Sequence, residues 1–217
     1  MSRIFYLIGK SSTGKDSLLE ALLADPALHL REIVQYTTRP IRDGEQEGRE
    51  YHFITMAESE ELERAGKVVE ARVYQTVHGP WKYMLVDDGQ IADAACDYIA
   101  VGTVESYRKV RDYYGEETVI PLYIYVETGE RLFRALKRER THDNPKYAEM
   151  CRRFLADEQD FSEEKLREAG LLLPDGSCRN GFENVDFQET LQNIREWIIR
   201  VREGNEGQSE RGASEDR

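Results

Sequence analysis

The chain has 217 residues, a length that suits one domain with room for an inserted subdomain but hardly for two independent cores. Its net charge of −12 argues against a nucleic-acid partner, because phosphate polyanions bind basic surfaces. No apolar run approaches the ~20 residues of a membrane span, and the N-terminal residues lack a signal peptide's apolar stretch, so we expect a cytoplasmic protein without a membrane partner. The three cysteines are widely separated, which indicates neither a disulfide framework nor a zinc site.

Strand-like and helix-like segments alternate along the chain, which predicts an α/β fold with a parallel sheet flanked by helices. The expected strands are residues 4–8, 33–36, 98–101, 119–126 and 182–185. The expected helices are residues 15–23, 104–114, 129–138, 148–169 and 187–201. In the last helix, large apolar side chains recur at helical spacing, which predicts that they belong to the core.

The pattern changes between residues 37 and 81, where a charged stretch at 39–53 precedes a short helix at 58–65 and a strand at 68–74. We interpret 37–81 as a small subdomain inserted into a core formed by 1–36 and 82–202. The basic segment at about 138–153 contains an Asn-Pro break and is a second candidate for a mobile part. Residues 203–217 contain no aromatic side chain and are expected to form a disordered acidic tail.

The sequence of residues 9–16 is Gly-Lys-Ser-Ser-Thr-Gly-Lys-Asp, between an apolar strand and a helix, as a phosphate-binding P-loop requires. Gly9 and Gly14 permit the tight turn that points successive N–H groups at one anion. The helix N-terminus adds partial positive charge, and Lys15 reaches the outer phosphates. A glycine-rich turn without a ligand is the weaker interpretation, because all the parts agree. The pattern predicts a nucleoside triphosphate site formed by Gly9, Lys10, Ser11, Ser12, Thr13, Gly14, Lys15, Asp16 and Ser17.

Asp16 departs from the P-loop pattern, which normally has a magnesium-binding Ser or Thr hydroxyl at this position. A carboxylate can also ligate magnesium, a hard cation that prefers oxygen. We therefore expect Asp16 to be the metal ligand and Mg²⁺ to be the cofactor, bound together with ATP. Without the metal between them, the carboxylate and the phosphates would repel each other.

A second motif lies in residues 37–53, Thr-Thr-Arg-Pro-Ile-Arg-Asp-Gly-Glu-Gln-Glu-Gly-Arg-Glu-Tyr-His-Phe. Arg39, Arg42 and Tyr51 form a set of donors able to hold a terminal phosphate, since the planar guanidinium group pairs bidentately with phosphate oxygens. In isolation, such a stretch would be interpreted as a solvated charged hairpin.

Together, the P-loop and the following T-T-R-x-x-R-x-G-E-x-x-G-x-x-Y-x-F pattern resemble the guanylate kinase family. The resemblance covers about residues 3–200 and is specific in the first 70. It implies a P-loop core, a nucleotide-monophosphate-binding subdomain at 37–81, a lid at about 138–153, and transfer of the terminal phosphate of Mg-ATP to GMP.

The resemblance also implies roles for single residues. Arg39, Arg42 and Tyr51 would hold the acceptor phosphate, and Glu70 would receive the N–H groups of guanine, although a lone glutamate is more often a surface charge. Asn184 would lie near the adenine of ATP. Lys15 and Arg39 would stabilise the transferring phosphoryl group. Lid arginines would act with them, and the match indicates Arg153 and either Arg138 or Arg140 for this role.

Several positions depart from the family pattern. Gly102 stands where the family usually has an Asp at the end of the third core strand, and Gln35 replaces a serine that usually touches guanine. The usual Tyr-Gly-[ST]-[ST] segment appears as His-Gly-Pro-Trp at 78–81. Its His78 is able to donate to a phosphate, whereas the proline and tryptophan do not replace hydroxyls, so base recognition depends mainly on Glu70.

Two alternatives remain open at this point. Ribose 1,5-bisphosphate kinases share this fold, the string Gly-Lys-Asp-Ser-Leu-Leu found here at 14–19 and the lack of the third-strand Asp, but not the complete 39–53 segment. A degenerate guanylate-kinase-like module that only binds a protein partner is the other alternative. The intact Lys15 and phosphate donors argue against it, because a binding module need not keep them. The oligomeric state stays open.

Overall fold

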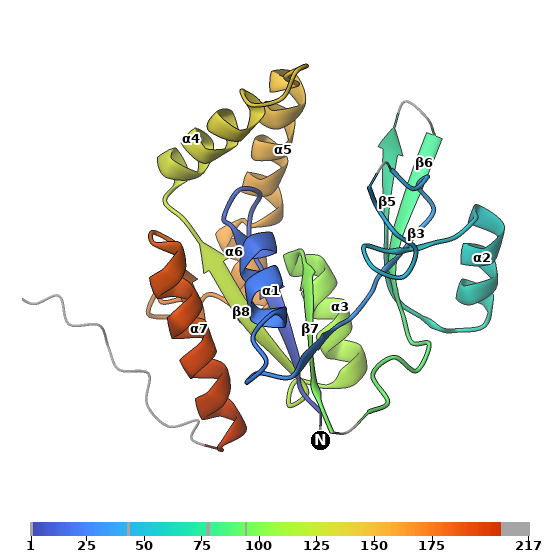
Figure 1. Cartoon of the computed structure of the whole chain (residues 1–217), viewed down its shortest axis with the longest axis horizontal. Coiled ribbons are helices and arrows are strands. Elements are labelled where there is room, and N and C mark those ends of the chain that lie inside the picture. The colour runs from blue at the N-terminus through green and yellow to red at the C-terminus, as the bar shows by residue number, and fades with distance from the viewer. Residues whose placement is uncertain (1, 43, 77–78, 94, 205–217) are drawn as a thin grey trace, which may run out of the picture.

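The computed structural model of the chain describes residues 2–42, 44–76, 79–93 and 95–204. The predicted site residue His78 and almost all of the expected tail lie outside these ranges. The described residues form a main lobe, a smaller second lobe and a pair of helices that projects above the main lobe (Figure 1). None of the described helices combines the length and the apolar character needed to cross a membrane.

The main lobe is built on a five-stranded sheet with the order β2-β7-β1-β8-β9, in which every neighbouring pair is parallel. The strands are, in that order, Leu30–Glu32, Asp97–Gly102, Ile4–Ile8, Val119–Tyr125 and Gly181–Glu183. The central strand β1 is buried at all of its residues, because helices cover both faces of the sheet. The predicted α/β fold with a parallel sheet is therefore confirmed.

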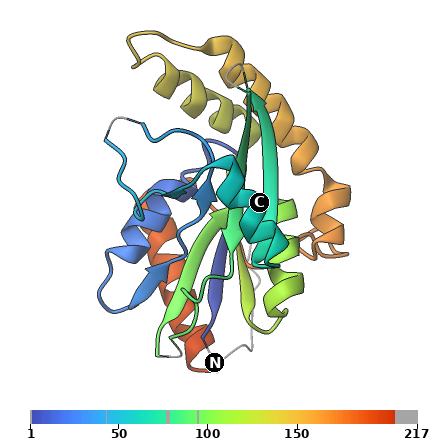
Figure 2. The same cartoon turned by 90° about the vertical axis from the view of Figure 1, so that its right-hand side faces the viewer.

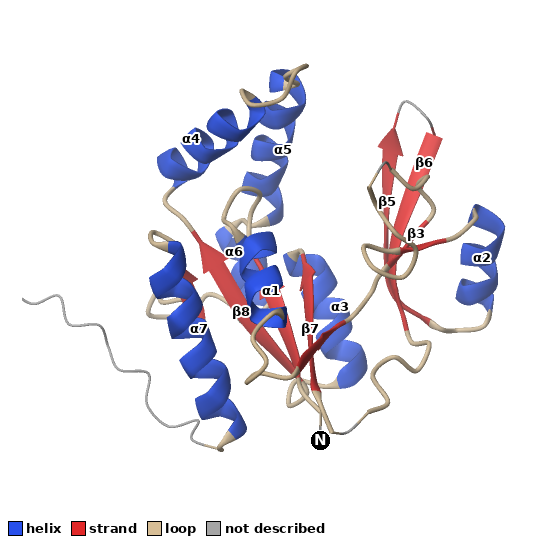
Figure 3. Ribbon diagram, viewed as in Figure 1, coloured by secondary structure: helices blue, strands red, loops and turns tan. Residues whose placement is uncertain are grey.

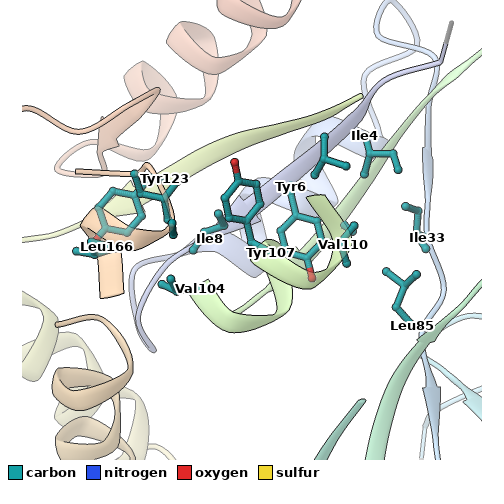
Figure 4. Packing of buried hydrophobic residues seen from close by; sticks show 14 of the residues in the cluster. Ile4, Tyr6, Ile8, Ile33, Leu85, Val104, Tyr107, Val110, Tyr123 and Leu166 are labelled. Atoms are coloured by element: carbon teal, nitrogen blue, oxygen red, sulfur yellow. The ribbon is translucent and has the colours of Figure 1, made fainter. Parts of the chain in front are cut away.

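Alternate residues of β1 pack into two cores on opposite faces of the sheet. Phe5 and Leu7 face helices α1 (Lys15–Leu23) and α7 (Phe187–Arg202). The other face carries Tyr6 against α3 (Val104–Tyr114) and α6 (Glu163–Glu168). Figure 4 shows Tyr6 beside Tyr107 and Val110 of α3, and the two tyrosine rings are 6.0 Å apart.

The second lobe contains a four-stranded sheet with the order β4-β3-β6-β5, coloured red in Figure 3 where its strands are in view. Its strands are β3 (Tyr36–Thr37), β4 (His52–Phe53), β5 (Val68–Thr76) and β6 (Gly79–Val86), and helix α2 (Met56–Arg64) packs beside them. A capping box between Thr55 and Glu58 fixes the start of α2. The sheet continues to Val86, past residue 81, where the inserted segment was expected to end.

The pair of projecting helices consists of α4 (Thr128–Glu139) and α5 (Tyr147–Asp160), which we call the lid helices. In Figures 1 and 2 they lie at the end of the molecule toward which the strands of the main sheet point. The β5–β6 hairpin reaches toward the same end. In parallel α/β sheets this edge is where ligands bind.

Two expected elements were wrong in extent. The helix expected at 148–169 divides into α5 and α6, because Phe161 leaves helical geometry and the hydroxyl of Ser162 accepts the amide hydrogen of Lys165 as a new N-terminal cap. The strand expected at 33–36 is mostly the connection between the lobes. Ile33 still donates its amide hydrogen to Ile99 in the main sheet, and Gln35 already accepts from His52 in the second lobe.

Candidate functional site

The loop between β1 and α1 is held in a tight turn by two glycines. Gly14 has a φ of 85°, a conformation that favours glycine. A Cβ atom at Gly14 would lie 2.5 Å from Nδ2 of Asn184, and one at Gly9 would lie 2.5 Å from the carbonyl oxygen of Ile124. Neither position has room for a side chain, so the loop can follow this path only with both glycines.

Asn184 holds this loop by a side-chain hydrogen bond. Its side-chain amide donates a 2.7 Å hydrogen bond to the carbonyl oxygen of Thr13, and the residue is 3% exposed. Thr13 in turn donates from its hydroxyl to the carbonyl of Lys10 at 2.9 Å. Asn184, which the family resemblance places near adenine, therefore also fixes the conformation of the phosphate-binding loop. The contact joins residues 171 positions apart in the sequence.

The loop ends at the N-terminus of α1, where charged side chains face outward. Lys15 is half-buried, and Asp16 and Ser17 are exposed in the first turn. Within the described ranges, no carboxylate forms an ion pair with Lys15 at 4 Å or less, so its charge is available to a ligand. The described residues also contain no group of three His, Cys, Asp or Glu side chains able to hold a metal ion by themselves.

Arg39 is anchored in the second lobe by a carboxylate. Its guanidinium group donates to both oxygens of Glu45, at 2.7 and 2.6 Å, and to the carbonyl oxygen of Pro40 at 3.0 Å. It also lies over the ring of Tyr51, with Cζ 5.1 Å from the ring centre. These contacts leave the Arg39 side chain 3% exposed, but they do not use all of its N–H donors.

Glu45 links the two arginines of the motif. Its Oε2 accepts the backbone N–H of Arg42 at 2.9 Å in addition to the bond from Arg39. The hydrogen bonds from Arg39 are the largest cause that lowers the pKa of Glu45 to about 2. The Glu45 carboxylate therefore stays charged near neutral pH. The side chain of Arg42, in contrast to that of Arg39, is exposed. One arginine is held in place and the other is free to approach a ligand.

The P-loop helix and the second lobe face each other. Burial is the largest cause of the raised pKa of Tyr51, and the carboxylate of Asp16 on α1 raises it further, so the two lie within electrostatic range. The lid also approaches the second lobe. The pKa of Arg152 on α5 is raised chiefly by its hydrogen bond to Glu149, and further by Tyr74 of β5. The P-loop helix thus lies near the motif of the second lobe, and the lid helix α5 lies near β5.

Two of the predicted lid arginines line a recess with the P-loop. The recess is bounded by Ser11 and Ser12 on one side and by Arg138 of α4 and Arg153 of α5 on the other. The third candidate, Arg140, is exposed and does not line it. The geometry therefore favours Arg138 over Arg140 as a group that reaches the loop.

Arg131 is a residue of the candidate site that the sequence did not reveal. It is 1% exposed, and its Nη1 lies 3.2 Å from Asp157 Oδ2, while its Nη2 contacts Glu158. The same two acids hold the loop, because Asp157 accepts the backbone N–H of Ser11 at 2.8 Å and Glu158 pairs with Lys10 at 2.8 Å. The P-loop and the lid are therefore joined by one polar cluster, and Lys10 belongs to it.

Glu70 is buried in strand β5 at the junction between the lobes, with its side chain 0% exposed. One oxygen, Oε1, accepts from the hydroxyl of Ser106 at 2.8 Å and pairs with Nη2 of Arg72 at 3.1 Å. The hydroxyls of Ser106 and Tyr6 are 2.6 Å apart. A Cβ at Gly102 would lie 2.3 Å from the Tyr6 hydroxyl, so this tyrosine fills the space where the family usually has an Asp.

Known proteins resemble this chain in sequence and in fold. The family model described as guanylate kinase matches residues 1–85. A guanylate kinase of Chromobacterium violaceum is 40% identical over 86 residues, which are 37% of this chain and 40% of that protein. A guanylate kinase of Thiobacillus denitrificans is 29% identical over 194 residues, which are 88% of this chain and 83% of that protein.

The chain is similar to guanylate kinases. The match to the Chromobacterium relative spans about two fifths of the length of that protein. A crystal structure of guanylate kinase from Anaplasma phagocytophilum aligns with a TM-score of 0.59 and 21% identity, covering 92% of this chain and 86% of that one. This likeness shows that the chain has the fold of that kinase, a P-loop core with a parallel sheet flanked by helices.

Proposed function

We propose that this guanylate kinase relative transfers the γ-phosphate of Mg-ATP to GMP. The observation that carries the proposal is that two candidate anion sites lie near each other. The P-loop amides and Lys15 lie on one side, the Arg39–Glu45–Arg42 cluster with Tyr51 lies on the other, and lid arginines lie above the loop. One phosphoryl transfer between two bound nucleotides requires this arrangement.

In the proposed reaction, an oxygen of the acceptor phosphate attacks the γ-phosphorus of ATP, and the bond from that phosphorus to the β–γ bridging oxygen breaks. ADP leaves with the electron pair, and the acceptor becomes a diphosphate. Such a transition state needs positioning and charge stabilisation more than covalent help from the protein. Lys15, Arg138 and Arg153 supply positive charge around the transferring group, and Arg42 and Tyr51 orient the acceptor.

The donor set fits a magnesium ion that is bound mainly by the nucleotide. Magnesium at phosphates keeps several waters and takes only one or two protein carboxylates, so a group of three acidic ligands is not required. Asp16 and Ser17 lie side by side in the exposed first turn of α1, where the triphosphate would reach them. When bound there, the ion supplies charge neutralisation at the β- and γ-phosphates.

The test is a coupled assay of ADP formation with purified full-length chain, Mg-ATP and a panel of acceptors. The panel contains GMP, dGMP, AMP, UMP and ribose 1,5-bisphosphate. We expect ADP formation with GMP and its loss in Lys15→Ala, because Lys15 would hold the ATP phosphates. The variant should still fold, because Lys15 carries no structural ion pair within the described residues. The matched control is Lys109→Ala on α3, where a surface pair with Glu105 contributes little.

Two outcomes would replace the proposal. ADP formation with ribose 1,5-bisphosphate alone would identify that sugar phosphate as the acceptor, as the string at residues 14–19 suggests. GMP binding in equilibrium dialysis without turnover of any acceptor would identify a binding module. Full activity of Lys15→Ala would contradict the proposed ATP site.

A further inference from the structure

We propose that Arg72 is a specificity-determining residue for the acceptor base, and that Arg72 and Glu70 together recognise the N1–H and C6=O edge of a 6-oxopurine. The inference rests on the proposed phosphate transfer to a nucleotide and deepens it. It assigns recognition of the carbonyl oxygen to a side chain that the family pattern does not include.

The guanidinium group of Arg72 is held by several neighbours. Arg72 and Glu70 are two positions apart on β5, so their side chains lie on the same face of the strand. Nη2 of Arg72 contacts Glu70 Oε1 and Gln35 Oε1, each at 3.1 Å. Gln35 is itself oriented, because its Nε2 donates to the carbonyl of Val101 at 2.9 Å. The position of Arg72 is therefore defined by both lobes.

Two polar atoms of this pair lack a partner among the described residues. They are Oε2 of Glu70 and Nε of Arg72, and both are buried. Leaving a buried carboxylate oxygen or N–H group unpaired is unfavourable, so a ligand that satisfies both would be favoured at this place. One atom accepts a hydrogen bond and the other donates one. Oε2 belongs to the same carboxylate as Oε1, and Nε belongs to the same guanidinium group as Nη2. Because Oε1 and Nη2 are in contact, the two unpaired atoms lie close together.

A 6-oxopurine presents the complementary pattern, with an N1–H donor next to the C6=O acceptor. Adenine presents an N1 acceptor next to an amino donor, so its N1 lone pair would meet the carboxylate. The Oε1 atom of Glu70 is already bonded to Ser106 and Arg72, which leaves only Oε2 for the ligand. The 2-amino group of guanine therefore gains little here, and hypoxanthine should be accepted almost as well as guanine.

Access to the pair depends on the junction between the lobes. Glu70 and Arg72 belong to β5 of the second lobe, whereas Ser106 belongs to α3 of the main lobe. A base reaches the unpaired atoms when β5 and α3 separate slightly. At the sequence positions where the family has a serine and a hydroxyl segment, this chain has Gln35 and Pro80, neither of which offers a hydroxyl. The recognition of O6 therefore falls to Arg72.

The first test compares kcat/KM for GMP, IMP and AMP in the wild type and in Arg72→Met. We expect IMP within about tenfold of GMP in the wild type, since one bond is worth about a factor of ten. We expect Arg72→Met to lower kcat/KM for GMP and IMP equally, by ten- to a hundredfold through KM, and to leave the low value for AMP unchanged. The matched control is Arg108→Met, whose exposed pair with Glu168 includes neither Glu70 nor Arg72.

A purely structural ion pair between Arg72 and Glu70 would give a different result. Arg72→Met would then lower stability and reduce all three nucleotides by one common factor, or it would change no ratio, and either result would overturn the proposal. The double variant Glu70→Gln with Arg72→Met removes both charges, so it avoids an unpaired buried carboxylate if the single variant does not fold. We expect it to lose the preference for 6-oxopurines over AMP.

A binding measurement separates this proposal from the proposed activity. The Nε–H resonance of Arg72 is identified in ¹⁵N-arginine-labelled protein by its absence in Arg72→Lys. We expect this resonance to shift on addition of IMP or GMP but not of AMP or ribose 5-phosphate. If no nucleotide is turned over, the proposed kinase activity fails, and the shift still decides whether Arg72 contacts the base. No shift with IMP or GMP would refute the role of Arg72.

Discussion

Replacing Glu45 by glutamine tests how the second lobe holds its phosphate-binding arginines. The change keeps the shape of the side chain but turns one acceptor oxygen into an amide donor, so Arg39 loses one of its two bonds to Glu45. Hydrogen bonds to charged groups contribute ~1.5–3 kcal/mol, and the Arg39 side chain is only 3% exposed. We expect Glu45→Gln to lower the free energy of unfolding by about 2 kcal/mol at pH 7.

Urea unfolding measures this loss as a lower midpoint, by about 1 M for a typical slope. The kinase assay should show a higher KM for the acceptor with an unchanged KM for ATP, because only the acceptor cluster is disturbed. Glu60→Gln on α2 is the control, since Glu60 is exposed. An unchanged midpoint together with an unchanged acceptor KM would refute the idea that Glu45 positions Arg39.

The pH dependence of the same pair has a definite sign. The folded pKa of Glu45 is about 2, below its ordinary value of 4.5, chiefly because Arg39 donates to the carboxylate. The stabilisation is therefore fully present above pH 4.5 and is lost as the pH falls from 4.5 toward 2. The difference in unfolding midpoint between wild type and Glu45→Gln should shrink across this window. A difference that is equal at pH 3 and pH 7 would contradict the assignment.

Two further variants test the loop and the lid. Asp157→Asn weakens the ion pair with Arg131 and the hydrogen bond from the backbone N–H of Ser11. We therefore expect a KM for ATP about tenfold higher, with little change in the KM for the acceptor. Equal changes in both KM values would argue against a local effect on the loop. Gly14→Ala forces a Cβ into a left-handed conformation 2.5 Å from Asn184 Nδ2. We expect it to destabilise the fold by ~1–3 kcal/mol and to abolish measurable ATP binding in titration calorimetry.

The sequence was sufficient to predict the elements whose pattern is local. The strand at 4–8 and the helices at 15–23 and 104–114 have the predicted bounds in the structure, because each combines apolar periodicity with clear end signals. The P-loop conformation also follows from local chemistry, since only glycine fits at positions 9 and 14. The change of pattern after residue 37 indicated the inserted second lobe, and the basic segment at 138–153 indicated a second mobile part. The family resemblance then assigned their roles as the acceptor subdomain and the lid.

Contacts between distant segments were not predictable in the same way. Strand β6 was missed because its residues, Gly79–Val86, are ordered by pairing with β5 and β3 rather than by their own alternation. Arg131 was missed because its partners Asp157 and Glu158 lie on another helix, and an arginine within an amphipathic helix usually faces solvent. Arg72 was missed for the same reason, since it is distinguished by burial beside Glu70 rather than by a motif.

The three parts around the proposed site each contain an arginine bound by acidic side chains. Arg39 is paired with Glu45 in the second lobe, Arg72 with Glu70 at the junction, and Arg131 with Asp157 at the lid. A buried guanidinium group without a partner would be strongly unfavourable, and a chain with a net charge of −12 supplies the partners locally. These acids fix the orientation of each arginine before a ligand binds. Positive charge at the site is therefore delivered mainly by the half-buried Lys15 and by exposed arginines, which carry weak partners or none within the described ranges: Arg42, Arg138 and Arg153. The buried pairs set the geometry. Removing an exposed group should impair phosphate transfer with little loss of stability, and removing a buried one should affect both.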